Sequence, residues 1–459
     1  MFSLLELIEQ RMEFVMAKII DKKSQGYPYL DKSVDIYTLD NGHKIIIANK
    51  QGDLVNISTW VKTGSIHEDD KISGISHFLE HLMFKGTPTN PAGDFDRILE
   101  AKGAIVNAAT WKDYTFYYVT LPNSKDGEDF RLVLDLHADM MLNPVLPEFE
   151  IGPTFSLEED APEKRERYVV IEEIRMREDQ PWTKVYNALN HSMYKCHPYK
   201  RDVIGTADII ASMPRDTIMD YYKNWYTPEN MTTIIVGDFN GDEIIDSVVE
   251  KFQFPEERTC ERPLWEQEIT QEHMEYIENT AKINTGFLIF GYHGAKASNL
   301  RDTILLDMVG IILGEGKSSR LQKHLIEQPK EPVFNMIGAD QYHFRDGNTF
   351  FVQANFQPEH KEKAIEDIKK EIEALSSISE DELKKTKKKL KIRFADSAET
   401  VSEIGETIGY YLTVCDDLGL FADYLNIMEN ITIDDVENAV KYYLSLDKAT
   451  ISVLIPEKE

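Results

Sequence analysis

The sequence has few cysteines, no long apolar run and little positive charge for its size. Its three cysteines, Cys196, Cys260 and Cys415, are odd in number and widely spaced. This argues against a disulfide framework and a thiolate metal site, and it favours a reducing compartment. No stretch approaches the roughly 20 apolar residues that cross a bilayer. We therefore expect a cytoplasmic protein without a membrane span.

The shortage of positive charge also limits the choice of partner. Lys and Arg total 51 against 80 Asp and Glu, so the formal net charge is −29. Binding to phosphate backbones needs a basic face, so we do not expect nucleic acid as a partner. An acidic field can attract basic peptides, although solubility alone also accounts for such a charge.

The chain repeats itself in two halves, each with strands and helices in the same order. At 459 residues it is too long for one ordinary core. A strand-like segment at 55–64 and a hairpin pattern at 104–122 have counterparts at 283–294 and 333–358. The helix and β-branched strand in 214–239 match those in 432–457. We predict an α+β protein of two homologous domains, each a mostly antiparallel sheet flanked by helices.

The expected boundaries follow from this repeat. Residues 1–34 form an N-terminal extension, which we read as helical because its apolar start is interrupted by charges and lacks the basic beginning of a signal peptide. Residues 35–255 form the first domain and residues 274–459 the second. The charged segment 256–273, which holds a proline, links them.

The strongest functional signal is GISHFLEHLMFKGT, residues 74–87. Ser73 can cap a helix there and Gly86 can end it. On this helix His77 and His81 are spaced i, i+4, so both imidazoles project from one face, and Glu80 lies on the same face. This H-x-x-E-H order is typical of inverted zincins, in which the glutamate polarises a metal-bound water. Zinc suits these ligands, though manganese and cobalt remain open, as does a metal-free surface helix.

A catalytic zinc needs a third protein ligand. Candidates lie in ERYVVIEEI, residues 166–174, where Glu166 and Glu173 are two helical turns apart and share a face. Glu172 points about 100° away from Glu173 and is the poorer choice. A solvated charged helix is the alternative for this segment.

These residues resemble the pitrilysin/insulinase family, in its half-length branch with mitochondrial processing peptidase and bacterial relatives. The likeness spans nearly the whole chain, including LDNGHKIIIA, GISHFLEHLMFKGT, NAATWKDYTFYYV, ERYVVIEEI, HPYKRDVIGT, YTPENMTTIIVGDF and LGEGKSSRL. It implies a metalloendopeptidase that holds one Zn²⁺ per chain on His77, His81 and Glu173. Glu80 then acts as general base and Glu166 as supporting acid. It also implies that peptide substrate adds as a strand beside Asn107, Ala108, Ala109 and Thr110.

The sequence departs from the family pattern in two places. The spacing from His81 to Glu173 is longer than usual, which we attribute to an inserted acidic loop at 150–164 that leaves the ligands intact. Active members also carry an Arg and a Tyr in the second domain, where this chain has Ile326 and Val333 or Phe334. None of these can donate a hydrogen bond to an oxyanion.

The second departure resembles the metal-bearing chain of a bacterial heterodimer, whose partner supplies the Arg/Tyr pair. We therefore expect a homologous partner subunit, with a homodimer as the alternative, and weak activity without the partner. Two other interpretations remain open: a non-catalytic scaffold of the same fold, and a module that captures peptides without cutting them. GEGKSS at 314–319 is not interpreted as a phosphate-binding loop, because Ile311 stands where that motif needs its first glycine.

Overall fold

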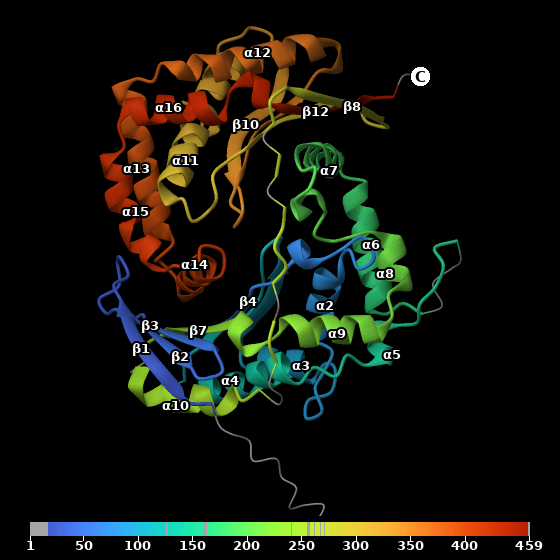
Figure 1. Cartoon of the computed structure of the whole chain (residues 1–459), viewed down its shortest axis with the longest axis vertical. Helices are drawn as coiled ribbons and strands as arrows, with labels where there is room; N and C mark the ends of the chain where they lie inside the picture. The colour runs from blue at the N-terminus through green and yellow to red at the C-terminus, as the bar shows by residue number, and fades with distance from the viewer. Residues whose placement is uncertain are drawn as a thin grey trace, which may run out of the picture.

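The structure is a computed structural model that describes residues 17–124, 127–158, 163–239, 241–254, 258–260, 262–266, 268–269 and 271–457. Two α+β halves lie one above the other, as predicted (Figure 1). Residues 1–16 of the helical extension expected at 1–34 lie outside the described residues. The helical assignment is wrong for residues 19–25, which form strand β1. Backbone pairing with β2 rather than side-chain burial holds this mostly exposed strand, and a hydrophobic pattern does not reveal such pairing.

The first half contains a seven-stranded sheet in the order β1-β2-β3-β7-β4-β6-β5. Its pairs are antiparallel except β3 with β7. The strand β5 lies at one edge, so one side of its backbone has no partner strand. The strands are β1 (Ile19–Gln25), β2 (Val34–Leu39), β3 (Lys44–Asn49), β4 (Leu54–Val61), β5 (Ile105–Thr110), β6 (Thr115–Pro122) and β7 (Met231–Gly237).

The second half contains a five-stranded sheet in the order β10-β11-β9-β12-β8. This order matches β5-β6-β4-β7-β3 strand for strand, and the single parallel pair, β8 with β12, falls at the corresponding place. The predicted internal repeat is therefore confirmed at the level of topology. The strands are β8 (Glu275–Ala281), β9 (Gly286–His293), β10 (Phe334–Tyr342), β11 (Thr349–Phe356) and β12 (Thr450–Pro456).

Helices flank both sheets and follow the repeat. In the first half they are α2 (Ile75–Met83), α3 (Asp94–Ala101), α4 (Glu128–Leu142), α5 (Glu148–Ile151), α6 (Glu166–Glu178), α7 (Pro181–Met193), α8 (Ala207–Ser212), α9 (Arg215–Trp225) and α10 (Gly241–Lys251). In the second half they are α11 (Leu300–Gly314), η4 (Gln322–Glu327), α12 (Lys361–Glu373), α13 (Glu380–Asp396), α14 (Val401–Thr413), α15 (Gly419–Asn430) and α16 (Ile433–Tyr443).

The two halves exchange one helix each. Helix α14 of the second half packs on β4 and β7 of the first sheet, and α7 of the first half packs on β9 and β12 of the second (Figure 1). This explains why β4 is buried along nearly its whole length on both faces. The exchange couples the halves through apolar contact, which is the dominant stabilising term in folding.

Glycines permit the close approach of α14 to the first sheet. A Cβ at Gly409 would lie 2.0 Å from Cε2 of Trp60, and a Cβ at Gly405 would lie 2.7 Å from Oδ1 of Asn56. Trp60 is a buried residue of β4, so it has little freedom to move away. The backbone of α14 therefore rests directly on the side chains of the sheet.

Replacing Gly409 by Ala is expected to lower the free energy of unfolding by about 1–3 kcal/mol, because the added methyl group overlaps the indole ring of Trp60. Urea denaturation would measure the change. Gly310→Ala is the matched control. Gly310 also lies in a helix, but its Cβ would meet neighbours at 3.6 Å or beyond, so Ala should be neutral or stabilising there. Equal effects of the two substitutions would contradict this account of α14.

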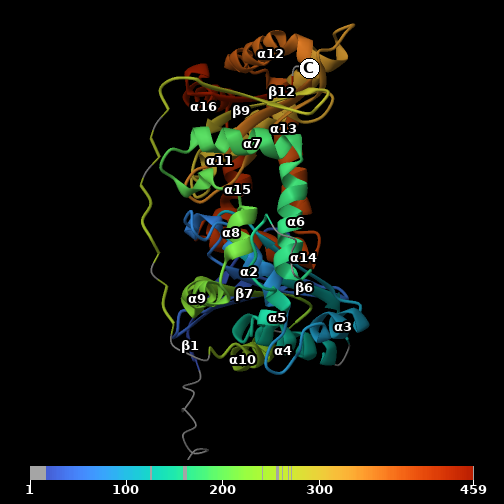
Figure 2. The ribbon, with the colours of Figure 1, turned by 90° about the vertical axis from the view of Figure 1, so that its right-hand side faces the viewer.

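The described residues between Phe252 and β8 form no helix or strand, and they run along one side of the molecule between the halves (Figure 2). This segment contains the linker predicted at 256–273. None of the helices that the structure describes is long and apolar enough to span a bilayer.

Candidate metal centre

The centre is built on α2, whose start differs from the sequence prediction. Gly74, not Ser73, is the N-cap, with φ of 90°, and a Cβ there would lie 2.5 Å from the carbonyl oxygen of Ile204. The buried Glu68 side chain accepts hydrogen bonds from the backbone N–H groups of Gly74 (2.7 Å) and Ser76 (3.0 Å). Glu68 therefore satisfies donors that Ser73 was expected to satisfy, and it holds the first turn of α2.

His77, His81 and Glu173 come together in space. Oε2 of Glu173 lies 3.7 Å from Nε2 of His77 and 3.6 Å from Nε2 of His81. One donor atom from each of the three residues lies within 4.8 Å of the others. Two ligands at 2.0–2.1 Å from a tetrahedral zinc are separated by about 3.3 Å, so small rotations bring these atoms to coordinating positions. Two imidazoles and a carboxylate also form a ligand set that zinc prefers.

Helix α6 presents Glu166 to the far side of the His81 ring. Oε2 of Glu166 lies 3.3 Å from Nδ1 of His81. Its Oε1 forms an ion pair with Nζ of Lys85 at 2.6 Å. A carboxylate on Nδ1 directs the lone pair of Nε2 toward the position between the three candidate ligands. Glu172 pairs instead with Arg175 at 2.6 Å, in keeping with its poorer ranking in the sequence analysis.

The pKa values of the two histidines are shifted in opposite directions. Burial lowers the pKa of His77 to about 3, with additional repulsion from His81 and Arg177, so the ring is neutral near pH 7, the form that binds metals. Burial also opposes the charged form of His81. The Glu166 hydrogen bond and nearby carboxylates outweigh it and raise the pKa of His81. In the metal-free chain, a proton therefore competes with a metal ion for His81 more strongly than for His77.

Glu80 lies beside this group without being part of it. Its Oε2 accepts a hydrogen bond from the Thr110 hydroxyl at 2.6 Å. Burial raises the pKa of Glu80 despite this bond. Thr110 is the last residue of β5, the edge strand that begins at Ile105. The expected substrate segment, residues 107–110, therefore lies on an open sheet edge next to α2, where Asn107 is exposed.

Replacing Thr110 by Val is expected to lower kcat about 10- to 100-fold with little change in KM, because a hydrogen bond to a charged group is lost. The pKa of Glu80 rises further without this donor, so the acidic limb of the pH–rate profile should move to higher pH. Thr110→Ser keeps the hydroxyl and should restore both. An unchanged profile in the Val variant would contradict this role of Thr110.

Sequence reasoning missed Glu68 and Lys85. Lys85 follows His81 by one helical turn, so the i, i+4 spacing contained a signal for it. Glu68 lies in the loop before α2, where no spacing rule identifies a capping residue. The acidic loop predicted at 150–164 connects α5 to α6, and its residues 159–162 lie outside the described part of the chain.

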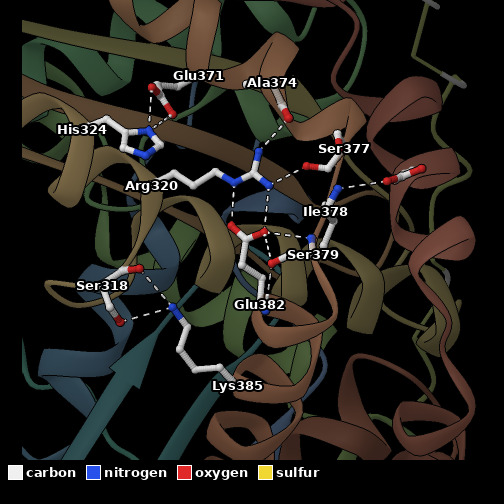
Figure 3. A network of polar contacts seen from close by, with 11 residues as sticks. Ser318, Arg320, His324, Glu371, Ala374, Ser377, Ile378, Ser379, Glu382 and Lys385 are labelled. Carbon is white, nitrogen blue, oxygen red and sulfur yellow. Dashed lines mark hydrogen bonds and ion pairs between the residues drawn. The ribbon is translucent and has the colours of Figure 1, made fainter.

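Ile326, Val333 and Phe334 stand where the family pattern has its Arg and Tyr. Val333 and Phe334 are buried in the core of the second half, and Ile326 packs against it from η4. The neighbouring loop 314–319 is tied to α13 by hydrogen bonds from Lys385 to the carbonyl and hydroxyl of Ser318 (Figure 3). Arg320, just after this loop, pairs with Glu382 of α13 through two hydrogen bonds of 2.7 and 2.9 Å (Figure 3).

Comparison with known proteins indicates a peptidase family. Residues 44–207 match the family model "Insulinase (Peptidase family M16)", and residues 212–390 match "Peptidase M16 inactive domain". The zinc protease PqqE of Helicobacter pylori is 28% identical over 93% of this chain and 94% of its own length. The uncharacterized zinc protease YmxG of Bacillus subtilis is 33% identical over 62% of this chain and 65% of its own.

Solved structures of proteases share this fold. The crystal structure of a protease from Helicobacter pylori superimposes with a TM-score of 0.82 at 26% identity, covering 92% of this chain and 99% of the other. The periplasmic protease PqqL from Escherichia coli shares the fold, with a TM-score of 0.74 at 20% identity. It is matched over 94% of this chain but only 48% of its own. By its sequence, its two-domain fold and its inverted motif, this chain belongs to the pitrilysin/insulinase (M16) family of peptidases, in its half-length form.

Proposed function

We propose that this chain is a zinc metalloendopeptidase that hydrolyses peptides or unfolded segments within an enclosed chamber formed with a partner subunit. The observation that carries the proposal is the convergence of His77, His81 and Glu173 from two helices, with Glu80 beside them. Relatives named zinc proteases support both the metal and the reaction class.

The residues have distinct roles in this proposal. His77, His81 and Glu173 would hold one zinc ion, which when bound lowers the pKa of its water toward ~7 and polarises the scissile carbonyl. Glu80 accepts the proton of the attacking water at Oε1 and returns it to the leaving amine. Glu166 and Lys85 keep the His81 ring oriented.

The edge strand β5 provides the substrate-binding surface. Its outer side, along residues Asn107 to Thr110, has no partner strand in the sheet. An extended peptide that adds there makes main-chain hydrogen bonds that do not depend on its sequence. The carbonyl of the added strand then lies beside α2, where Glu80 can act on the water.

A partner subunit is part of the proposal. Ile326, Val333 and Phe334 leave the second half without a donor for the oxyanion, so a homologous chain would have to supply one. PqqL of Escherichia coli, matched over about half of its length, supports a two-unit arrangement. We expect a heterodimer, with a homodimer as the alternative. Three cysteines without a disulfide support a cytoplasmic location for the pair.

The decisive test is hydrolysis of a fluorogenic peptide library by the purified chain, with and without a homologous subunit sought by co-purification from the native source. We expect about one zinc per chain, slow hydrolysis alone and at least 10-fold faster hydrolysis with the partner. A chain that holds no zinc, or that binds peptides but cleaves none with the partner present, would overturn the proposal.

One observation favours a second function, capture of peptides without cleavage. The second half matches the model of the inactive M16 domain and lacks the donors for the oxyanion. In that case peptide affinity would be measurable while turnover stays at background with any partner. The same assay therefore separates the two functions.

A further inference from the structure

A strongly basic segment lies in the second half of this acidic protein. Seven of the ten residues from 384 to 393 are Lys or Arg, although the whole chain carries a net charge of −29. They lie on α13, next to the loop 314–319. The proposed peptidase function does not require this concentration of charge.

Part of the charge is neutralised within the fold. Lys389 and Arg393 both pair with Glu315, at 3.4 and 2.6 Å, and Lys391 pairs with Glu429. These contacts attach α13 to the loop 314–319 and to α15. They do not account for the lysines on the remaining faces of the helix.

Six lysines of α13 and of the neighbouring residues 314–323 have no carboxylate oxygen within 4 Å among the described residues. One of them, Lys387, donates to the backbone carbonyl of Glu429, which leaves five. Four of them are exposed, and the fifth, half-buried Lys385, donates only to the Ser318 carbonyl (3.0 Å) and hydroxyl (3.2 Å). Burial, followed by repulsion from Lys389, lowers the pKa of Lys385, although Glu382 and Glu315 act in the opposite direction. We call this group the basic surface: Lys317, Lys323, Lys384, Lys385 and Lys388.

The basic surface stands on a rigid base. Arg320 donates to both carboxylate oxygens of Glu382 and, at 2.6 Å, to the carbonyls of Ala374 and Ser377 (Figure 3). Ser379 and Glu382 form a capping box at the start of α13. The surface is therefore pre-organised, which reduces the entropy lost when a ligand binds.

The spacing of the lysines suits an extended acidic peptide. Lys384 and Lys388 are one helical turn apart, about 6 Å along the axis. Alternate residues of an extended chain are separated by about 6.7 Å and point to the same side. Alternate Glu or Asp residues can thus face successive lysines.

We propose that the basic surface binds an acidic segment of the substrate polypeptide, remote from the bond that is cleaved. This inference rests on the proposed function for the identity of the ligand as substrate. The long-range field of a chain with net charge −29 disfavours a long nucleic acid, so a short acidic stretch in an extended peptide is the better match.

The first test measures binding without hydrolysis. Fluorescence anisotropy of a labelled peptide with alternating Glu and Ser is compared with its Gln counterpart, using the full chain carrying Glu80→Gln. We expect at least 10-fold tighter binding of the Glu peptide, lost when Lys384→Gln and Lys388→Gln are added. The matched control, Lys223→Gln with Lys441→Gln, removes the same charge from exposed positions on α9 and α16 and should retain the preference.

The second test uses hydrolysis by the wild-type chain. Substrates that carry four Glu residues at increasing distances from the cleaved bond should show a kcat/KM maximum at one distance, and the Lys384/Lys388 variant should lose it. Binding of the Glu peptide without any hydrolysis would refute the proposed function and leave the basic surface standing. Hydrolysis with no preference in either test would overturn the basic surface alone. Tighter binding of a single-stranded oligonucleotide, or lysine-dependent self-association, would also overturn it.

Discussion

Replacing Glu80 by Gln is expected to lower kcat for peptide hydrolysis by about 10³-fold or more, within the range for loss of a general base. The amide has nearly the same shape and still accepts the Thr110 hydroxyl, so the site should keep its geometry. It cannot take a proton from water. Zinc content should stay the same, because Glu80 lies outside the three residues that converge.

The measurement combines steady-state kinetics with metal analysis of the same preparation. Glu100→Gln makes the same change on the exposed face of α3 and serves as the control. If Glu80→Gln lost zinc together with activity, Glu80 would be a ligand rather than the base. Retention of more than about a tenth of the activity would also contradict the assignment.

Replacing Glu173 by Ala is expected to weaken zinc binding more than any other single change on α6, because Glu173 is the proposed zinc ligand on this helix. Glu166→Ala should weaken it by about 10- to 100-fold, the range for a partner that orients a ligand. Glu173→Ala should exceed that range and abolish hydrolysis.

Competition with a chromophoric chelator would give the zinc affinities of the wild-type chain, Glu173→Ala and Glu166→Ala. Glu172→Ala is the matched control, because this neighbouring side chain pairs with Arg175 and points away from the site. If Glu166→Ala weakened zinc binding more than Glu173→Ala, Glu166 would be the third ligand instead. Zinc binding that is unchanged in both variants would place the ion elsewhere.

The site shows how far local rules extend. The pairing of His77 with His81 follows from the pitch of one helix, so it was predictable from spacing alone. The hydrogen bond from Thr110 to Glu80 joins residues 30 positions apart and depends on how β5 lies beside α2. No periodicity in either segment contains that information.

The start of α2 also depends on contacts that local propensity does not specify. Ser73 has the side chain of a good N-cap, yet the chain places Gly74 at that position in a left-handed conformation, against the backbone of Ile204. The carboxylate of Glu68 takes over the capping. Propensity identified the start of the helix to within one residue, and tertiary contact decided which group satisfies its donors.

By itself the sequence determined the two-part α+β organisation, the helix that carries His77, Glu80 and His81, and the choice of α6 as the source of the third candidate ligand. The first two depend on periodicity and spacing along one or two segments, whereas the third followed from the resemblance to the pitrilysin/insulinase family. Only the tertiary structure decided that α7 and α14 exchange between the halves, that Lys85 and Thr110 support the site, and that the lysines of α13 form one surface. Such contacts join residues far apart in the chain, and their energies depend on packing that no local pattern specifies.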